Sequence, residues 1–281
     1  MSEGIRRLAV PFFFCISGYW YISKLISGKN VFKNTFLKVL ETYVVWTIIY
    51  YTVEIPLWIM AGANFKGVIV TMVTGFFVDG TIYHFWYFIA LLWSIVITTL
   101  LYRTKNVYLI TILPIVTYLI GLFSLTYHII PFTIPTVLLR IFGRGIPFFM
   151  LGGVIKKYEA SSKSIGNLCI AIALWVLELI FIYLCDLSGS AVVTLTMPLV
   201  LFWLMIALIQ HPKYNLVKIG EWTHKLSSWI YFSHPLIIII FGDIMHMNML
   251  AESFIIISIV SIVIGIIIIQ NNMLVKILKL K

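Results

Sequence analysis

The chain has 281 residues, of which 62% are hydrophobic and only 11% are charged, and its mean hydropathy is +1.06. This composition excludes an ordinary soluble domain, in which about 25% of residues are charged. The apolar side chains must therefore face a lipid bilayer. The formal net charge of +10 would suit a nucleic-acid-binding protein only if the basic residues gathered on one face or in a tail. They lie instead in short clusters between apolar segments, so we expect no nucleic-acid partner.

Nine apolar segments along the chain approach the length of about 20 residues that a transmembrane helix needs. In chain order they cover residues 8–25, 39–60, 82–101, 107–127, 134–155, 165–185, 191–209, 228–247 and 250–270. A tenth apolar segment, at 67–78, is too short to span and suggests a re-entrant or interfacial piece. The sequence thus predicts an all-α polytopic integral membrane helix bundle with about nine transmembrane helices, in which residues 1–281 form a single membrane-embedded domain.

Most of the 20 basic residues fall in alternate loops, which the positive-inside rule places in the cytoplasm. We therefore expect a multi-pass protein of the cell membrane with a cytoplasmic C-terminus. With nine helices, the same rule puts the N-terminus outside, led by Arg6 and Arg7. Because that first helix would insert against its local charge, the topology predicts one further helix upstream.

Two arginines are predicted at the outer starts of helices, each just before a proline. Arg7 precedes Pro11, and Arg144 precedes Pro147. A proline frees a backbone carbonyl, and an arginine beside it can hold a phosphate or carboxylate with two hydrogen bonds. Each arginine could equally be an interfacial anchor. Both segments also share the pattern of a basic residue, Pro-Phe-Phe and glycine. The pattern is either an internal repeat or a coincidence, and coincidence is favoured because aromatic residues and glycine are common in this chain.

His84 lies among aromatic residues in the stretch TIYHFWYF, at the predicted outer start of a helix. Rings such as Trp86 can stack on the C–H face of a sugar while an imidazole orients or takes a hydroxyl proton. The alternative, which spacing alone favours, is the aromatic belt found at membrane interfaces.

His234 is predicted about six residues into its helix from the inner side, directly before Pro235. A neutral histidine at that depth needs a partner, and Tyr231 and Ser233 are the nearest candidates in sequence. His234 is thus either a proton-transfer group or a structural histidine with satisfied hydrogen bonds. Glu178 is a further ionisable residue in mid-helix, for which we expect a partner on another helix.

Cys15, Cys169 and Cys185 lie inside apolar stretches without metal-type spacing, so we expect no metal site. The chain also lacks a phosphate-binding loop, a dinucleotide-binding glycine pattern and a serine-hydrolase elbow. These absences argue against a pump driven by nucleotide hydrolysis within this chain.

Five motifs follow one another in an order that resembles the membrane-bound acyltransferase 3 family, in its Gram-positive type. They are RRLAVPFFFCISGYW (6–20), LETYVVWTIIY (40–50), YHFWYFIALL (83–92), GRGIPFFMLGGVI (143–155) and SSWIYFSHPLI (228–237). The resemblance implies a ten-helix membrane enzyme that moves an acyl group, commonly acetyl, from cytoplasmic acyl-coenzyme A to a hydroxyl of an envelope carbohydrate. It also implies a catalytic histidine on a first helix upstream of Arg6, and we expect this helix to be missing from the chain. In place of the family's cytoplasmic Arg-x-x-Arg motif stand Lys33 and Lys38, without the bidentate arginine fork.

If the chain is such an enzyme, the chemistry of acyl transfer suggests a role for each candidate residue. Lys33 and Lys38 would attract the phosphates of acyl-CoA (acetyl-CoA), the donor substrate. Contacts to the acceptor or to the developing oxyanion would come from Arg7, His84, Trp86 and Arg144, with Tyr231 beside the acceptor. His234 is the best candidate for proton transfer, with His84 as the second catalytic histidine.

Two other functions stay open at this point. Proline- and glycine-broken helices also suit a transporter of a small polar solute or an envelope polysaccharide. A truncated remnant without activity is the third possibility. The partners predicted in each case are the bilayer and, for the enzyme, the carbohydrate acceptor, whereas the oligomeric state is unknown.

Overall fold

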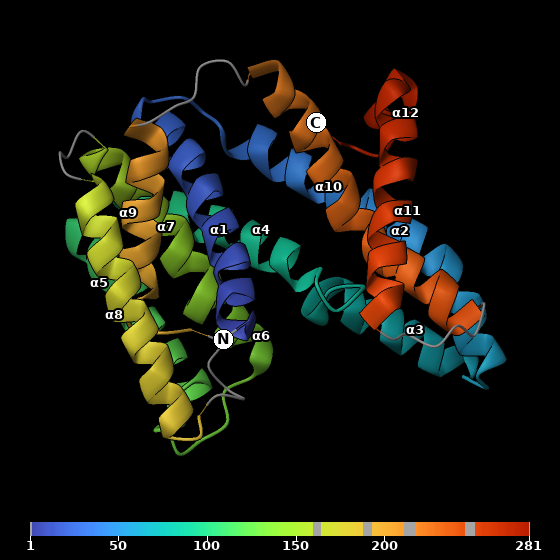
Figure 1. Cartoon of the computed structure of the whole chain (residues 1–281), viewed down its shortest axis with the longest axis horizontal. Helices are drawn as coiled ribbons and strands as arrows, with labels where there is room; N and C mark the ends of the chain where they lie inside the picture. The colour runs from blue at the N-terminus through green and yellow to red at the C-terminus, as the bar shows by residue number, and fades with distance from the viewer. Residues whose placement is uncertain (1, 160–163, 188–192, 211–216, 245–250, 281) are drawn as a thin grey trace. The chain divides into compact units, whose positions relative to one another are not determined.

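The computed structural model describes residues 2–159, 164–187, 193–210, 217–244 and 251–280, and the described residues contain helices and no strands (Figure 1). Each of the nine predicted segments contains a helix in the part of the chain that the structure describes. Among the described residues, seven helices are long and apolar enough to cross a membrane, whereas Met197–Gln210 and Ile256–Gln270 are shorter apolar helices. The prediction of an all-α polytopic membrane bundle is confirmed.

The chain divides into two compact units. Unit 1 comprises residues 1–40 and 73–212, and unit 2 comprises residues 41–72 and 213–281. Unit 1 contains α1 (Ser2–Ile26), the start of α2 (Phe32–Met60), η1 (Gly75–Asp79), α4 (Trp86–Thr104), α5 (Val107–Leu125), α6 (Thr136–Arg140), η2 (Ile141–Gly145), α7 (Ile146–Tyr158), α8 (Ser164–Leu184) and α9 (Met197–Gln210). The segments labelled η are single π-helical turns.

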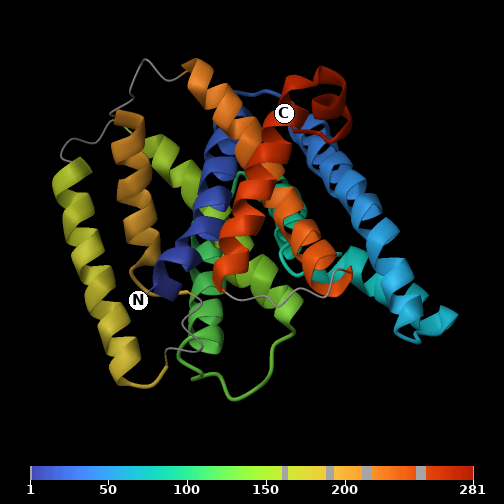
Figure 2. The same cartoon turned by 45° about the vertical axis from the view of Figure 1, so that its right-hand side comes forward.

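Unit 1 is organised around the parallel pair α1 and α7, which lie side by side (Figure 2). Their backbones touch because glycines stand at the crossing. A β-carbon on Gly18 would collide with the carbonyl of Phe149, and one on Gly152 would collide with the carbonyl of Cys15. Small residues allow this close packing between membrane helices. The two segments that share the Pro-Phe-Phe pattern are therefore packing partners.

One end of this helix pair is joined by the carboxylate of Glu159, just beyond α7. The Tyr19 hydroxyl donates to its Oε2 at 2.5 Å, and Lys156 Nζ donates to its Oε1 at 2.6 Å. The Lys156 ammonium, followed by the Tyr19 hydroxyl, lowers the pKa of Glu159 below its usual 4.5. Gln210 at the end of α9 adds a hydrogen bond to the Glu159 carbonyl at 3.0 Å. Helices α1, α7 and α9 are thus connected at one residue.

Glu178 on α8 has partners in the turns next to two other helices, whereas its sequence position predicts a partner on a helix. Its carboxylate accepts the backbone N–H groups of Leu195 and Thr196 and the Thr196 hydroxyl, all in the turn that leads into α9. Tyr127 donates a fourth hydrogen bond at 2.9 Å. The carboxylate therefore satisfies the donors ahead of α9, and it explains why this helix begins at Met197 rather than near residue 191 as predicted. Residues 191 and 192 lie outside the described part.

Unit 2 contains the rest of α2, most of α3 (Phe65–Thr74), α10 (Val217–Ile239), η5 (Ile240–Ile244), α11 (Ala251–Gln270) and α12 (Asn272–Ile277). Helices α10 and α11 lie side by side (Figure 1). Trp46 of α2 stacks on Phe232 of α10 with ring centres 4.9 Å apart and donates to the carbonyl of Leu278 at 3.1 Å. Trp229 donates to the carbonyl of Ser261 on α11 at 2.9 Å. Tryptophans thus join the helices of this unit.

The apolar segment predicted to be re-entrant or interfacial at 67–78 forms α3 and η1, and the helix changes from α to π geometry between Thr74 and Gly75. Its ten α-helical residues are too few to cross the hydrocarbon core. The Tyr51 hydroxyl donates to the carbonyl of Met72 at 2.6 Å, which ties α3 to α2 within unit 2.

Candidate functional site

The candidate site in unit 1 begins with Trp86, the first residue of α4. Gly80, which follows η1, has a φ of 88°, in the left-handed region that glycine adopts at little cost. A β-carbon there would also collide with the backbone nitrogen of Trp86. This glycine therefore lets the chain turn back, so that Asp79 lies beside the start of α4.

The second part of the site is the π-helical turn η2, which carries Arg144. Gly143 lies against Gly121 of α5, where a β-carbon added to Gly143 would stand 2.9 Å from the Gly121 α-carbon. Gly145 lies against α4 in the same way, because a β-carbon added to Gly145 would stand 2.9 Å from the hydroxyl oxygen of Ser94. The glycines on both sides of Arg144 therefore fix this turn between two helices. Single π-helical turns of this kind are frequent at functional sites.

Two arginines one helical turn apart converge on the Trp86 ring. The guanidinium carbon of Arg144 lies 5.2 Å from the ring centre, and that of Arg140 lies 5.7 Å away. Both distances fall within the range of a cation–π interaction. Arg140 also donates to Asp79, with 3.3 Å between Nη1 and Oδ1 and 3.3 Å between Nη1 and the backbone oxygen. These three charged groups together carry one net positive charge.

Helix α1 supplies the aromatic surroundings of the cluster. The Phe14 ring lies 6.4 Å from that of Trp86 and 4.7 Å from that of Tyr87. Ser17 and Tyr87 share a hydrogen bond of 3.4 Å between their hydroxyl oxygens. Since α1 is packed on α7, the same contacts that hold the bundle together hold the indole that meets the arginines.

The sequence-predicted residues of unit 1 are brought together in part. Arg144 and Trp86 are in direct contact, and the partly buried His84 lies in the turn two residues before Trp86. Arg7 lies in α1, but its side chain is outside the part whose side chains the structure describes. Lys33 and Lys38 are exposed near the start of α2.

His234 and Tyr231 belong to unit 2, on α10. His234 Nδ1 lies 2.9 Å from the carbonyl oxygen of Ile230, one turn back along the helix. Because a carbonyl only accepts, Nδ1 is the donor in this hydrogen bond, and Nε2 is the other ring nitrogen. The imidazole thus has a hydrogen-bond partner in a backbone carbonyl of its own helix, a group that was not among the side chains expected from sequence.

Asp79 and Arg140 belong to the cluster, although neither has a role predicted from the sequence. The available signal was the spacing of Arg140 and Arg144, four residues apart across a glycine, because side chains at that spacing lie on one face of a helix. Asp79 had no such signal, since only the folded chain places it beside Arg140. Among the described residues, no group of three His, Cys, Asp or Glu side chains could hold a metal ion.

Comparison with known proteins places the chain in a family. Residues 1–270 match the family model described as an acyltransferase domain, the acyltransferase 3 family. The chain is 32% identical over 260 residues to a serine/alanine racemase of Enterococcus gallinarum, a match that covers 82% of this chain and 35% of that protein. It is 32% identical over 124 residues to an amino-acid racemase of Enterococcus faecalis, covering 42% of this chain and 17% of that protein.

The chain therefore spans about a third or less of the length of these curated relatives. No solved structure matches it. With a family model that covers nearly its whole length, and with the apolar helices described above, this multi-pass membrane protein belongs to the acyltransferase 3 family.

Proposed function

We propose that the chain is an O-acyltransferase of the cell membrane that moves an acyl group, acetyl in the simplest case, from acyl-CoA to a hydroxyl of an envelope carbohydrate. The observation that carries the proposal is the cluster in which Arg144 and Arg140 lie 5.2 and 5.7 Å from the Trp86 ring centre. In a chain of this family, two converging guanidiniums are suited to the charge that develops during acyl transfer.

The reaction forms an ester bond and breaks a thioester bond. The acceptor oxygen attacks the thioester carbonyl as its proton moves to a base, and the carbonyl oxygen becomes an oxyanion. Arg144 stabilises that oxyanion, because a guanidinium donates charge-assisted hydrogen bonds. The coenzyme A thiolate then leaves and takes up a proton. Trp86 acts as a positioning residue, since its ring holds both arginines.

His234 is the proposed general base. Its hydrogen bond to the Ile230 carbonyl supports this role, because it leaves Nε2 as the nitrogen that can accept a proton. Tyr231, one residue beyond Ile230 on α10, would contact the acceptor. His84, two residues before Trp86 in the chain, would be the second catalytic histidine. It would orient the acceptor hydroxyl or take its proton. Arg7, on α1, would contact the acceptor or the oxyanion.

The donor phosphates are assigned to Lys33 and Lys38. Their exposure near the N-terminus of α2 supports this role, because the first turn of a helix and its lysines both attract anions. The same exposure suits the cytoplasmic position that the positive-inside rule predicts for them.

The test is transfer of radiolabelled acetyl from acetyl-CoA to the envelope carbohydrate fraction, measured in membranes with and without the chain. The proposal expects chain-dependent incorporation that is released by mild alkali as acetate, as for an ester. If incorporation does not depend on the chain while secretion or uptake of a polar solute does, the bundle is a transporter. If neither depends on it, the chain is an inactive remnant.

A further inference from the structure

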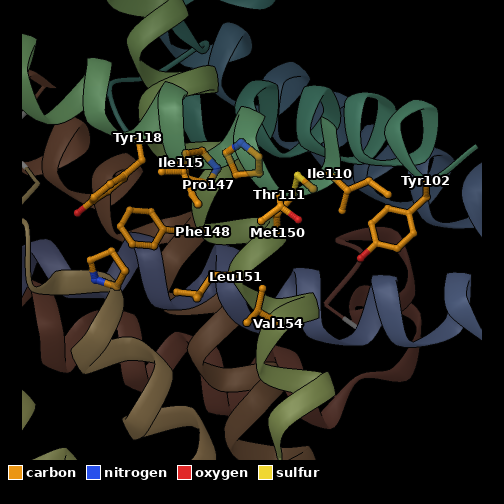
Figure 3. Close-up of a pocket in the computed structure, with 12 residues that line it drawn as sticks. Tyr102, Ile110, Thr111, Ile115, Tyr118, Pro147, Phe148, Met150, Leu151 and Val154 are labelled. Carbon is orange, nitrogen blue, oxygen red and sulfur yellow. The ribbon is translucent and has the colours of Figure 1, made fainter. Parts of the chain in front are cut away.

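Unit 1 contains an apolar cavity on its flank, apart from the arginine cluster. The cavity has a volume of about 240 Å³ and lies between α4, α5, α7 and α9 (Figure 3). Tyr118 and Tyr102 stand at its two ends, with Ile115, Phe148 and Met150 among the side chains between them. The lining residues of α5 extend from Ile110 to Tyr118, which is about 12 Å at the rise of an α-helix. This is close to one leaflet of a hydrocarbon core about 30 Å thick.

Two of the three side-chain hydroxyl groups in the lining are hydrogen-bonded within the protein, and the third belongs to Tyr102 at one end of the cavity. The Thr111 hydroxyl donates to the carbonyl of Val107 at 2.9 Å, and the Tyr118 hydroxyl donates to the carbonyl of Thr194. An apolar cavity without polar partners holds water poorly. Its natural occupant is therefore a hydrocarbon chain.

The mouth of the cavity faces outward from the bundle. Ile115 is 54% exposed and Val154 is 46% exposed, although both line the cavity. Ile112, one turn away from Ile115 on α5, is also 54% exposed but does not line it. Exposed apolar residues on a membrane-spanning helix face lipid, so the cavity opens laterally to the bilayer.

Basic residues mark one end of the cavity. Arg103 follows the lining residue Tyr102 directly, and Lys105 follows two residues later, at the end of α4. On α7, Lys157 comes three residues after the lining residue Val154. All three cationic side chains are exposed, so they are placed to attract an anionic headgroup at the interface.

From this geometry we propose that the cavity binds one acyl chain of an anionic phospholipid, whose headgroup lies at Arg103, Lys105 and Lys157. A chain of about a leaflet's length fits the distance along α5, and the positive end selects the headgroup charge. The proposal does not depend on acyl transfer, because it uses neither the arginine cluster nor His234.

The test uses the purified full chain in nanodiscs with a phosphatidylglycerol probe that carries a diazirine within one acyl chain. After irradiation, cross-linked peptides are mapped by mass spectrometry. We expect cross-links in the segments 110–118 and 147–154, displaced by unlabelled phosphatidylglycerol but not by phosphatidylcholine. Equal displacement by phosphatidylcholine, or labels spread over all exposed helices, would mean a general lipid layer and would overturn the proposal.

A matched pair of variants separates the cavity from its surface. Ile115→Trp fills the mouth and should weaken site-specific labelling by roughly tenfold or more, because excluding about two buried methylene groups costs that much affinity. Ile112→Trp alters an equally exposed isoleucine outside the cavity and should leave labelling unchanged. Size-exclusion profiles check that both variants fold. Equal labelling of the two variants would contradict the proposal, and displacement by palmitoyl-CoA alone would assign the cavity to a donor chain instead.

Discussion

The guanidinium carbon of Arg144 lies 5.2 Å from the centre of the Trp86 ring, although the two residues are 58 positions apart in sequence. The contact joins a π-helical turn to the first residue of α4, and glycines on both sides of Arg144 allow it. A desolvated cation–π contact contributes about 2 kcal/mol, enough to hold a guanidinium in one place.

Replacing this ring should loosen both arginines at once. Trp86→Leu is expected to lower kcat for acyl transfer by roughly tenfold, since about 1.4 kcal/mol of lost positioning corresponds to that factor. Transfer kinetics with acetyl-CoA measure the change. Trp93→Leu is the matched control, because Trp93 is on the same helix, is 49% exposed and lies outside the cluster. A similar loss of kcat in both variants would contradict the proposed positioning role of Trp86.

The contact between α1 and α7 depends on glycine at the crossing. Gly152→Ala should lower the melting temperature of the detergent-solubilised protein by several degrees, because its β-carbon would collide with the backbone of α1. Gly166→Ala on α8 should be neutral or stabilising, since a β-carbon there has no neighbour within 4 Å and alanine favours helix. If the two variants melt alike, the glycine contact does not determine the stability of this pair.

The carboxylate of Glu178 should be important for the start of α9. Glu178→Gln puts an amide N–H among the donors of Leu195 and Thr196 and should cost about 2 kcal/mol of unfolding free energy. Reversible unfolding in mixed micelles measures the loss. Tyr183→Phe, on the same helix and 72% exposed, provides the comparison and should change little. An unchanged stability of the Glu178 variant would show that water replaces the carboxylate.

The ion pair of Glu159 predicts a pH dependence. Because Lys156 and Tyr19 lower the pKa of this carboxyl in the folded protein, its stabilising effect is complete above the ordinary value of 4.5 and is lost as pH falls through the lower, folded value. The melting temperatures of the wild type and of Glu159→Gln should differ at pH 7 and converge below about pH 4. A difference that stays constant over this range would contradict the assignment.

The helices could be predicted from sequence because each is a long apolar segment between charged loops. Glu178 could also be interpreted, since a mid-helix carboxylate requires a partner. The cluster around Trp86 could be predicted only in part. Asp79 and Arg140 join it because of the turns at Gly80 and η2, which a hydropathy pattern does not reveal. The prediction that α9 begins near residue 191 was wrong for a related reason. The start of this helix depends on backbone N–H groups that donate to Glu178 on another helix, α8.

The most direct test of the acyl-transfer account compares two conservative arginine variants in membranes. Radiolabelled acetyl transfer from acetyl-CoA should fall about 100-fold in Arg144→Lys, because lysine lacks the planar fork that would bind an oxyanion. It should stay at the wild-type rate in Arg103→Lys, which keeps its charge and lies outside the cluster. Transfer by Arg144→Lys at the wild-type rate would contradict the account.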